Sequence, residues 1–431
     1  MEMKDRYPIA VVGGGPAGCM AAIKASTAGE KVVLLEKNPD IGRKILLTGN
    51  GRCNLTNNSS LSVLLEKFGR RGSFFRTAFS TFTSNDLVSF FNKAGLKVKE
   101  EDGGRIFPIT DRSQSVNDVL RDQLKKGKVK IIYNYPVQEL KKEDGYFQIK
   151  KAKNSGMKNK QKKLIPPISD VILASRVILS TGGVSYPKTG STGDGYQLAR
   201  DLGHHITPLK PGLVPLKIKE DWTRSLQGVV LKEVGLTFRH GKQGRIKGEG
   251  DVLFTHYGVS GPTILDLSQD VVKLLDREVE VKLFLDLIPT VTREKMEGIL
   301  LADLKKHGKK DLQNYLRRYL PLGFIKPFLE EMAIDSNKKL NQIHRRERIT
   351  LLDNIKNLKL TVNGSLPLVK AMVTCGGISR REINPETMES RLVPGLYLAG
   401  EIIAGCATSG GYNLQQAFST GFLAGKGAGG L

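Results

Sequence analysis

The 431-residue sequence has no apolar run near the roughly 18 residues that a membrane-spanning helix needs. It also shows no secretory signal at its start, because Glu2, Lys4 and Arg6 carry charges and the apolar run that follows is broken by glycines from Gly13 onward. We therefore expect a cytoplasmic protein with no membrane span.

Cysteine is scarce. The four residues of this type (Cys19, Cys53, Cys375 and Cys406) form no C-x-x-C pair. This spacing is typical of neither a zinc site nor a disulfide scaffold. We expect reduced thiols and no metal site.

Acidic residues are few relative to basic residues. Lys and Arg number 67 against 43 Asp and Glu, which gives a net charge of +24. The positive electrostatic field of such a protein attracts nucleotides, acidic substrates, RNA or acidic membrane surfaces, and the net charge alone does not indicate which of them binds. Residues 150–163 contain seven lysines and no acid. We interpret this run as a solvated insertion between two strands, with a functional basic tag as the alternative.

The order of local patterns predicts an α/β protein. Residues 8–12 and 31–35 are strand-like, and the helical pattern of residues 17–28 separates them, as at the opening of a doubly wound sheet. Short β-rich pieces follow Gly212, and a helical pattern follows Thr292. We predict a Rossmann-like domain with an inserted antiparallel β domain and a helical subdomain. The predicted boundaries are 1–210 for the first part of the nucleotide-binding domain, 211–290 for the β domain, 291–357 for the helical subdomain and 358–431 for the return.

A glycine motif lies between the first predicted strand and the first helix. Gly13, Gly15 and Gly18 form G-x-G-x-x-G, and Glu36 ends the next strand. Gly13 permits the tight turn, Gly15 lets a diphosphate approach the backbone, and Gly18 lets the helix pack closely. A carboxylate at Glu36 would bind an adenosine ribose and repel a 2′-phosphate. The motif therefore favours FAD or NAD over NADP.

The C-terminal segment favours FAD over NAD. Residues 394–401 form a strand that ends in Gly400 and Glu401, and Gly410 and Gly411 then open a helix over residues 414–424. In many flavoproteins such a segment returns to the first sheet, where its acid holds the ribityl chain. The N-terminus of the helix can then stabilise negative charge on the reduced flavin ring.

Several blocks in one order resemble the FAD-binding family of NAD(FAD)-utilizing dehydrogenases, aminoacetone-oxidase-like enzymes and bile-acid-pathway reductases. These blocks are residues 42–44, 48–57, 103–108, 180–183, 185–195, 254–262, 376–378 and 384–385, together with the Gly400 and Gly411 segments. The resemblance covers nearly the whole chain and implies the same three-part fold. It also implies FAD held by Gly13, Gly15, Pro16, Ala17, Gly18, Glu36, Lys37, Arg43, Asn54, Val137, Gly182, Gly400, Glu401, Gly411, Tyr412, Asn413 and Leu414. We expect the FAD to be noncovalent, because no cysteine or histidine is placed for a covalent link.

The chain departs from that family in one segment. Members usually carry aspartates between the Gly-Glu and Gly-Gly-Tyr-Asn blocks, whereas residues 402–409 here contain no acid. This segment should lie beside the flavin. We therefore expect neutral or acidic substrates rather than amines.

A flavin supplies the redox chemistry, and the protein supplies position and electrostatics. We predict an oxidoreductase that transfers a hydride between the flavin and a small or medium organic molecule, with NADH or oxygen as a possible redox partner. A nicotinamide would bind only transiently, because no second G-x-G-x-x-G motif lies between a predicted strand and a predicted helix. The candidate catalytic residues are His256, Tyr186 and Lys188, and structural hydrogen bonding is the alternative for each. The candidate substrate-adjacent residues are Arg52, Cys53, Arg105, Tyr257 and Cys406. We expect the substrate between the FAD domain and the inserted β domain. An RNA-interacting flavoprotein and a non-catalytic redox sensor remain alternatives.

Overall fold

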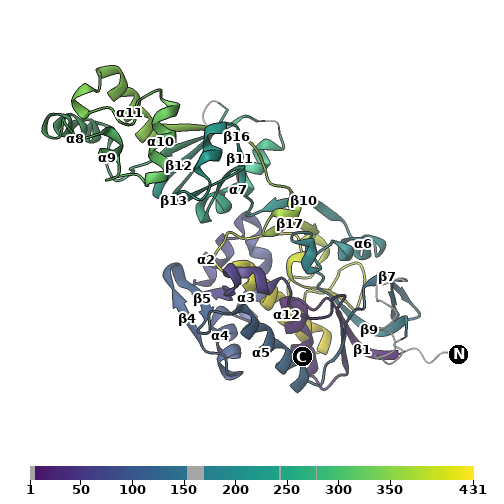
Figure 1. The fold of residues 1–431 in the computed structure, drawn as a ribbon. Helices are drawn as coiled ribbons and strands as arrows, with labels where there is room; N and C mark the ends of the chain where they lie inside the picture. The colour runs from purple at the N-terminus through teal and green to yellow at the C-terminus, as the bar shows by residue number, and fades with distance from the viewer. Residues whose placement is uncertain (1–4, 153–168, 242–243, 278) are drawn as a thin grey trace, which may run out of the picture. The chain divides into compact units, whose positions relative to one another are not determined.

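A computed structural model of the chain describes residues 5–152, 169–241, 244–277 and 279–431. The chain divides into two compact units (Figure 1). Unit 1 comprises Met1–Lys210 and Met372–Leu431, and unit 2 comprises Pro211–Ala371. Most of the lysine-rich run at 150–163 lies outside the described residues, so the interpretation of it as an insertion stays a prediction.

Unit 1 is built on a seven-stranded sheet with the order β6-β2-β1-β9-β8-β7, and β18 also pairs with β9. The parallel strands are β1 (Asp5–Val12), β2 (Val32–Leu35), β6 (Lys130–Ile132), β9 (Val171–Leu179) and β18 (Leu396–Leu398). The antiparallel strands are β7 (Val137–Glu143) and β8 (Tyr146–Lys151). β2 is buried throughout, β9 along most of its length and β1 along its second half, as expected of parallel strands covered on both faces.

The central helices of unit 1 pack closely on each other. α1 (Pro16–Ser26) begins with proline, which is well suited to the first helical position. α12 (Tyr412–Gly429) runs along it, and a Cβ on Gly421 would lie 2.2 Å from the carbonyl oxygen of Ala17. Small residues on both helices therefore allow the C-terminal segment to reach the nucleotide-binding loop.

Smaller elements complete unit 1. A three-stranded sheet has the order β3 (Thr56–Asn57), β5 (Arg105–Pro108), β4 (Val98–Glu101). The other helices are α2 (Leu61–Glu66), α3 (Arg76–Thr81), α4 (Ser84–Lys93), α5 (Ser113–Lys126) and α6 (Asp194–Asp201). The strands that leave and re-enter unit 1, β10 (Ile206–Gly212) and β17 (Val373–Ile378), pair with each other.

Unit 2 contains a closed barrel. Its strands, in order, are β11 (Leu216–Ile218), β14 (Gly258–Ser260), β13 (Gly244–Thr255), β12 (Val230–His240), β15 (Val281–Asp286) and β16 (Leu358–Ser365). The predicted return to the FAD domain at residue 358 is therefore wrong, because β16 pairs with β11 and β15 and closes the barrel. The chain re-enters unit 1 at Met372. The sequence prediction also missed α7 (Pro262–Leu275) within the β-rich region.

A helical subdomain lies between β15 and β16 in the chain. It consists of α8 (Arg293–Lys306), α9 (Leu312–Leu316), α10 (Leu322–Glu331) and α11 (Arg345–Asn357). One apolar core joins these helices to the barrel, including Phe254, Phe324 and Leu352. Within the described residues, no helix is both long and apolar enough to cross a membrane.

Candidate functional site

The main cavity of unit 1 opens where its parallel strands end. β1, β2, β9 and β18 all run in one direction, so their carboxyl ends meet at a single edge of the sheet. The cavity is lined there by residues at or shortly beyond the ends of these strands, including Gly13, Glu36, Gly182 and Gly400. This edge is the usual ligand site of a doubly wound sheet.

The glycine loop has the geometry that the motif predicts. Gly13 has a φ of +104°, and a Cβ there would lie 2.6 Å from the Ser180 carbonyl oxygen. A Cβ on Gly18 would lie 1.9 Å from the Gly13 carbonyl oxygen, so helix α1 could not pack as it does. Gly15 lines the cavity, and a Cβ there would meet no protein atom within 4 Å. The open space at Gly15 is therefore available to a ligand that approaches the backbone.

Glu36 presents a buried carboxylate at the end of β2. Its side-chain oxygens accept hydrogen bonds from the Gly14 amide at 2.7 Å and from the Asn38 amide at 2.8 Å. These bonds fix the carboxylate at the rim of the glycine loop, in the position that binds an adenosine ribose in this type of fold.

Glu401 lines the same cavity as Glu36. The residues that hold its carboxylate were not singled out by the sequence analysis. Lys44 Nζ lies 2.9 Å from Glu401 Oε2 and donates to Ser185 Oγ at 2.6 Å. The Thr374 amide donates to Glu401 Oε1 at 2.8 Å. Both charged side chains are about four-fifths buried, which makes the pair stronger than an exposed one. In the sequence, the only indication of a role for Lys44 was that it belongs to residues 42–44, one of the segments that resemble the family.

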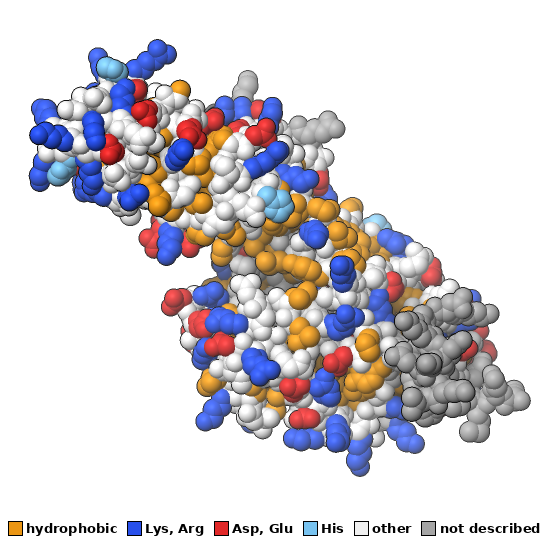
Figure 2. All heavy atoms as spheres, in the orientation of Figure 1, with side chains coloured by type: hydrophobic (Ala, Val, Ile, Leu, Met, Phe, Trp, Pro, Cys, Tyr) orange, Lys and Arg blue, Asp and Glu red, His pale blue; other side chains and the backbone are white. Residues whose placement is uncertain are grey.

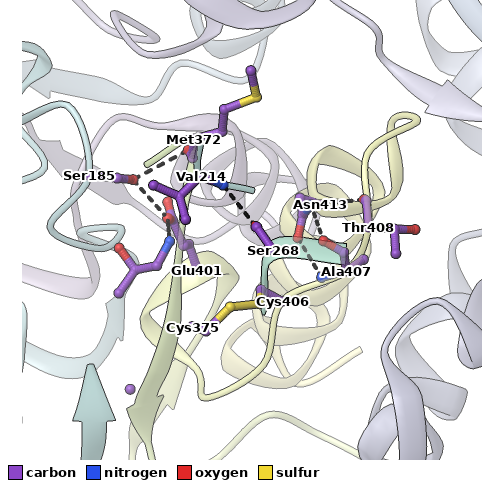
Figure 3. Close-up of a disulfide and its surroundings, with 12 residues drawn as sticks. Ser185, Val214, Ser268, Met372, Cys375, Glu401, Cys406, Ala407, Thr408 and Asn413 are labelled. Atoms are coloured by element: carbon purple, nitrogen blue, oxygen red, sulfur yellow. Dashed lines mark hydrogen bonds between the residues drawn. A yellow bond between two sulfur atoms is a disulfide. The ribbon is translucent and has the colours of Figure 1, made fainter. Parts of the chain in front are cut away.

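The start of α12 forms one wall of the cavity. Gly411 has a φ of +96°, and a Cβ there would lie 2.5 Å from the Thr56 carbonyl oxygen, so glycine is required. Asn413 and Leu414 line the cavity. The Asn413 side chain accepts from the Ala407 amide at 2.9 Å and donates to the Ala407 carbonyl at 3.1 Å (Figure 3). These bonds hold the acid-free segment against the helix start.

The remaining predicted cofactor residues divide into two groups. Those that line the cavity with the residues above are Pro16, Ala17, Lys37, Arg43 and Val137. Gly18, Asn54, Gly411 and Tyr412 do not line it but support it from neighbouring positions. Asn54 Oδ1 is buried with no hydrogen-bond partner among the described residues, and its contact with FAD stays a prediction. The open space at Gly15 and the carboxylate of Glu36 fit FAD.

Cys406 corrects the expectation of reduced thiols. It forms a disulfide with Cys375, and their Cα atoms are 5.3 Å apart (Figure 3). Cys375 lies on β17, two residues beyond Val373, which lines the cavity. Cys53 is fully buried, and burial raises the pKa of its thiol to about 12. Neither Cys53 nor Cys406 lines the cavity, so their role beside a substrate stays a prediction.

The two arginines among the candidate substrate-adjacent residues already have partners. Arg52 forms a two-pronged ion pair with Glu101, at 2.7 and 2.9 Å, and its guanidinium lies 4.0 Å from the centre of the Phe107 ring. The hydrogen bond to Arg52 lowers the pKa of Glu101. Arg105 donates from Nε to the Asp102 carbonyl. These bonds favour a structural role for both arginines.

The candidate catalytic residues lie on two different units. Tyr186 and Lys188 belong to a loop of unit 1 that leads into the cavity-lining residues Thr189 and Gly190. His256 and Tyr257 form the turn between β13 and β14 in unit 2, where their rings contact edge-to-face. Their catalytic and substrate-binding roles remain predictions.

Together, the sheet, the glycine loop and the returning C-terminal segment define an FAD-binding domain of an oxidoreductase. The chain belongs to the family described as HI0933-like protein Rossmann domain, whose model matches residues 7–427. The match spans both units. It confirms the prediction of a flavoprotein with a Rossmann-type domain.

Two relatives are similar over nearly the full length of the chain. A 3-dehydro-bile acid delta(4,6)-reductase from Clostridium scindens is 33% identical over 97% of this chain and 98% of its own. A ribosomal RNA dihydrouridine synthase from Escherichia coli is 28% identical over 96% of each chain. Both names describe enzymes, and this chain is likewise an FAD-dependent oxidoreductase.

Solved structures show the same fold. A 3-ketosteroid delta1-dehydrogenase from Sterolibacterium denitrificans, in complex with 1,4-androstadiene-3,17-dione, matches with a TM-score of 0.54 and 14% identity. The match covers 99% of this chain and 100% of that chain. At this identity the likeness concerns the fold alone.

Proposed function

We propose that this enzyme reduces a carbon–carbon double bond conjugated with a carbonyl group. The two relatives' names describe this chemistry on different molecules. A 3-dehydro bile acid with 4,6 double bonds is a conjugated ketone, and the double bond of uridine that is absent from dihydrouridine is conjugated with a ring carbonyl. In the reaction proposed for this chain, a hydride would add to the carbon of the double bond that is remote from the carbonyl, and a proton would add to the carbon next to the carbonyl.

The main support from the site is the start of α12. Reduced FAD supplies the hydride and carries negative charge in its ring system. The N-terminus of a helix stabilises nearby negative charge through its free amides and its dipole. Asn413 and Leu414 occupy this helix start and line the cavity. The arrangement favours the reduced, hydride-donating form of the cofactor.

The remaining roles follow from the chemistry of the side chains. The glycine loop binds the diphosphate, and Glu36 and Glu401 bind the two sugar-like parts of FAD. The candidates for donating the proton are Tyr186, Lys188 and His256. The carbon next to the substrate carbonyl would accept it. Residues 402–409 contain no acid, so this part of the site offers no counter-charge to an amine.

A single-turnover experiment tests this function. The holoenzyme is reduced under anaerobic conditions and mixed with a 3-oxo-4,6-diene steroid acid or with uridine, and the return of the oxidised flavin absorbance is followed. A matched saturated 3-oxo steroid acid serves as the control. We expect reoxidation by a conjugated acceptor only. Equal rates with the saturated control, or reduction of the oxidised enzyme by a primary amine with no reaction of either acceptor, would overturn the proposal.

A uracil base in RNA is a second candidate for the substrate. The net charge of +24 favours it, because RNA is a polyanion. The E. coli relative's name supports it as well. Its test is the formation of dihydrouridine in an RNA incubated with the reduced holoenzyme.

A further inference from the structure

Basic residues surround a hollow in the helical subdomain of unit 2. These residues are distant in sequence from the FAD-binding motifs. The hollow lies around the end of α8 and the short helix at Leu340–Gln342. The basic residues that line it are Lys305, Lys306, His307, Lys309, Lys310 and Arg348. No aspartate or glutamate is among its lining residues. Figure 2 shows Lys and Arg side chains gathered over the part of unit 2 where Figure 1 labels α8 and α9.

The four lysines of this hollow are exposed and are not paired with any acid in the described parts of the chain. Of the acids nearby, Asp303 pairs with Arg318 and also lies 3.9 Å from His307 of the hollow, Asp311 pairs with Lys339, and Glu347 pairs with Lys338. The hollow therefore keeps a net positive charge, although acids are close to it in the sequence.

Helix stability accounts for only part of this pattern. Lys305 and Lys306 lie in the last turn of α8, where cations interact favourably with the helix dipole. Lys309 and Lys310 lie beyond the helix end, where this effect has faded. Arg348 adds a second observation, because its Nε is buried with no hydrogen-bond partner among the described residues. A buried donor of this kind calls for an acceptor.

We propose that this basic hollow binds the phosphate backbone of RNA. The proposal rests on the second form of the proposed function, in which the reduced base belongs to RNA. Closely spaced cations around a concave surface match the repeated phosphates of a folded RNA strand. An anionic membrane is a poorer match, because interfacial binding needs an apolar face, and Leu301 is the only exposed large hydrophobic residue that lines the hollow.

The test compares two variants of equal net charge. In the hollow variant, Lys305, Lys306, Lys309 and Lys310 are each changed to Gln. In the control variant, four exposed barrel lysines that form no ion pair with a described carboxylate are changed to Gln: Lys217, Lys232, Lys247 and Lys359. Binding of a fluorescein-labelled RNA hairpin to each holoenzyme is measured by anisotropy over a series of salt concentrations. Flavin content and circular dichroism check the folding of each variant.

We expect the hollow variant to bind the hairpin at least tenfold more weakly at low salt. Loss of four phosphate contacts should also lower the slope of log affinity against log salt by about 3. The control variant should stay near the unmodified protein in both measures. Equal losses in the two variants would overturn the proposal, since net charge alone would then explain binding. Unchanged RNA binding with weaker binding to phosphatidylserine vesicles would overturn it in favour of a membrane surface.

Failure of this proposal can be told from failure of the proposed function. If the enzyme reduces a conjugated acceptor but the hollow variant binds the hairpin normally, the RNA surface is wrong and the reductase assignment stands. If the hollow variant loses RNA binding but no conjugated acceptor reoxidises the flavin, the surface stands and the reductase assignment is wrong.

Discussion

Cys375 and Cys406, 31 residues apart in the chain, form a disulfide that links β17 to the segment 402–409. Cys375 lies on β17 near Val373, and Cys406 lies next to Ala407, which is hydrogen-bonded to Asn413. Val373 and Asn413 both line the cavity. The bond therefore constrains the acid-free segment in which this chain departs from its family.

Breaking this bond should destabilise the protein. We expect the Cys375→Ser/Cys406→Ser double variant to lose about 2–4 kcal/mol of unfolding free energy, because the unfolded chain gains freedom. It should also retain FAD less tightly. Urea unfolding with and without dithiothreitol measures the effect. The reductant should shift the midpoint of the unmodified protein and leave that of the double variant unchanged, and equal shifts in both would contradict the prediction.

The sequence predicted those parts of the site that depend on neighbouring residues. The glycine loop and Glu36 belong to one βαβ unit, in which local patterns set the fold. The start of α12 was also recognised, because Gly410 and Gly411 directly precede a helical pattern. In each of these cases a short stretch of chain carries both the conformation and the chemistry.

Pairings between distant segments could not be predicted. Lys44 and Glu401 are 357 residues apart, and no local pattern relates them. The disulfide is similar, since cysteine spacing does not reveal which side chains meet. The predicted end of the insertion was also wrong. The sequence of β16 is typical of a short strand and does not reveal that this strand pairs with β11 and β15 to close the barrel. Strand partners are decided by packing and register across the whole unit.

NADH should bind only transiently. The described residues contain one G-x-G-x-x-G loop between a strand and a helix, at residues 13–18, and FAD fits that site. We expect a dissociation constant for NADH of the oxidised holoenzyme in the micromolar range or weaker, corresponding to less than about 8 kcal/mol of binding energy. Isothermal titration calorimetry measures it, and titration with adenosine diphosphate ribose is the control. Nanomolar binding would require a dedicated second nucleotide site and would refute the prediction.

Cys53 should make stability fall at alkaline pH. Burial raises the pKa of its thiol from 9.0 to about 12. Between these values the unfolded chain loses a proton that the folded chain keeps, so the contribution is complete below pH 9 and is lost as the pH rises toward 12. From about pH 9 to about pH 11 the unmodified protein should lose roughly 2 kcal/mol more than Cys53→Ala. Parallel pH dependences for the two proteins in urea unfolding would argue against it.

The ion pair between Lys44 and Glu401 should matter for cofactor binding. Glu401→Gln keeps the side-chain shape but leaves Lys44 without its counter-charge, at a site where both groups are mostly buried. We expect FAD affinity to fall by about 10- to 100-fold, as for the loss of a charged hydrogen bond of about 1.5–3 kcal/mol. Asp270→Asn, which breaks the exposed pair with Lys273, is the control and should change little. Quenching of flavin fluorescence on binding to the apoprotein measures both affinities.

Gly15 and Gly18 should respond differently to substitution, although they belong to one motif. Gly15 has a φ of −76°, which any residue adopts, and a Cβ there would meet no protein atom. Gly15→Leu should therefore leave the stability of the apoprotein within about 1 kcal/mol and abolish FAD binding, because the side chain would occupy the space for the diphosphate. Gly18→Ala should destabilise the apoprotein by about 1–3 kcal/mol, because its Cβ would overlap the Gly13 carbonyl.

Urea unfolding of the apoprotein and the ratio of flavin to protein separate the two effects. Gly298→Leu is the control for Gly15→Leu, since Gly298 lies in α8 and also has open space around it. It should change neither quantity much. If Gly15→Leu kept its full flavin content, the diphosphate could not lie against this loop, and the placement of FAD in the cavity would have to be abandoned. If Gly15→Leu instead unfolded like Gly18→Ala, the glycine at this position would serve packing rather than the ligand.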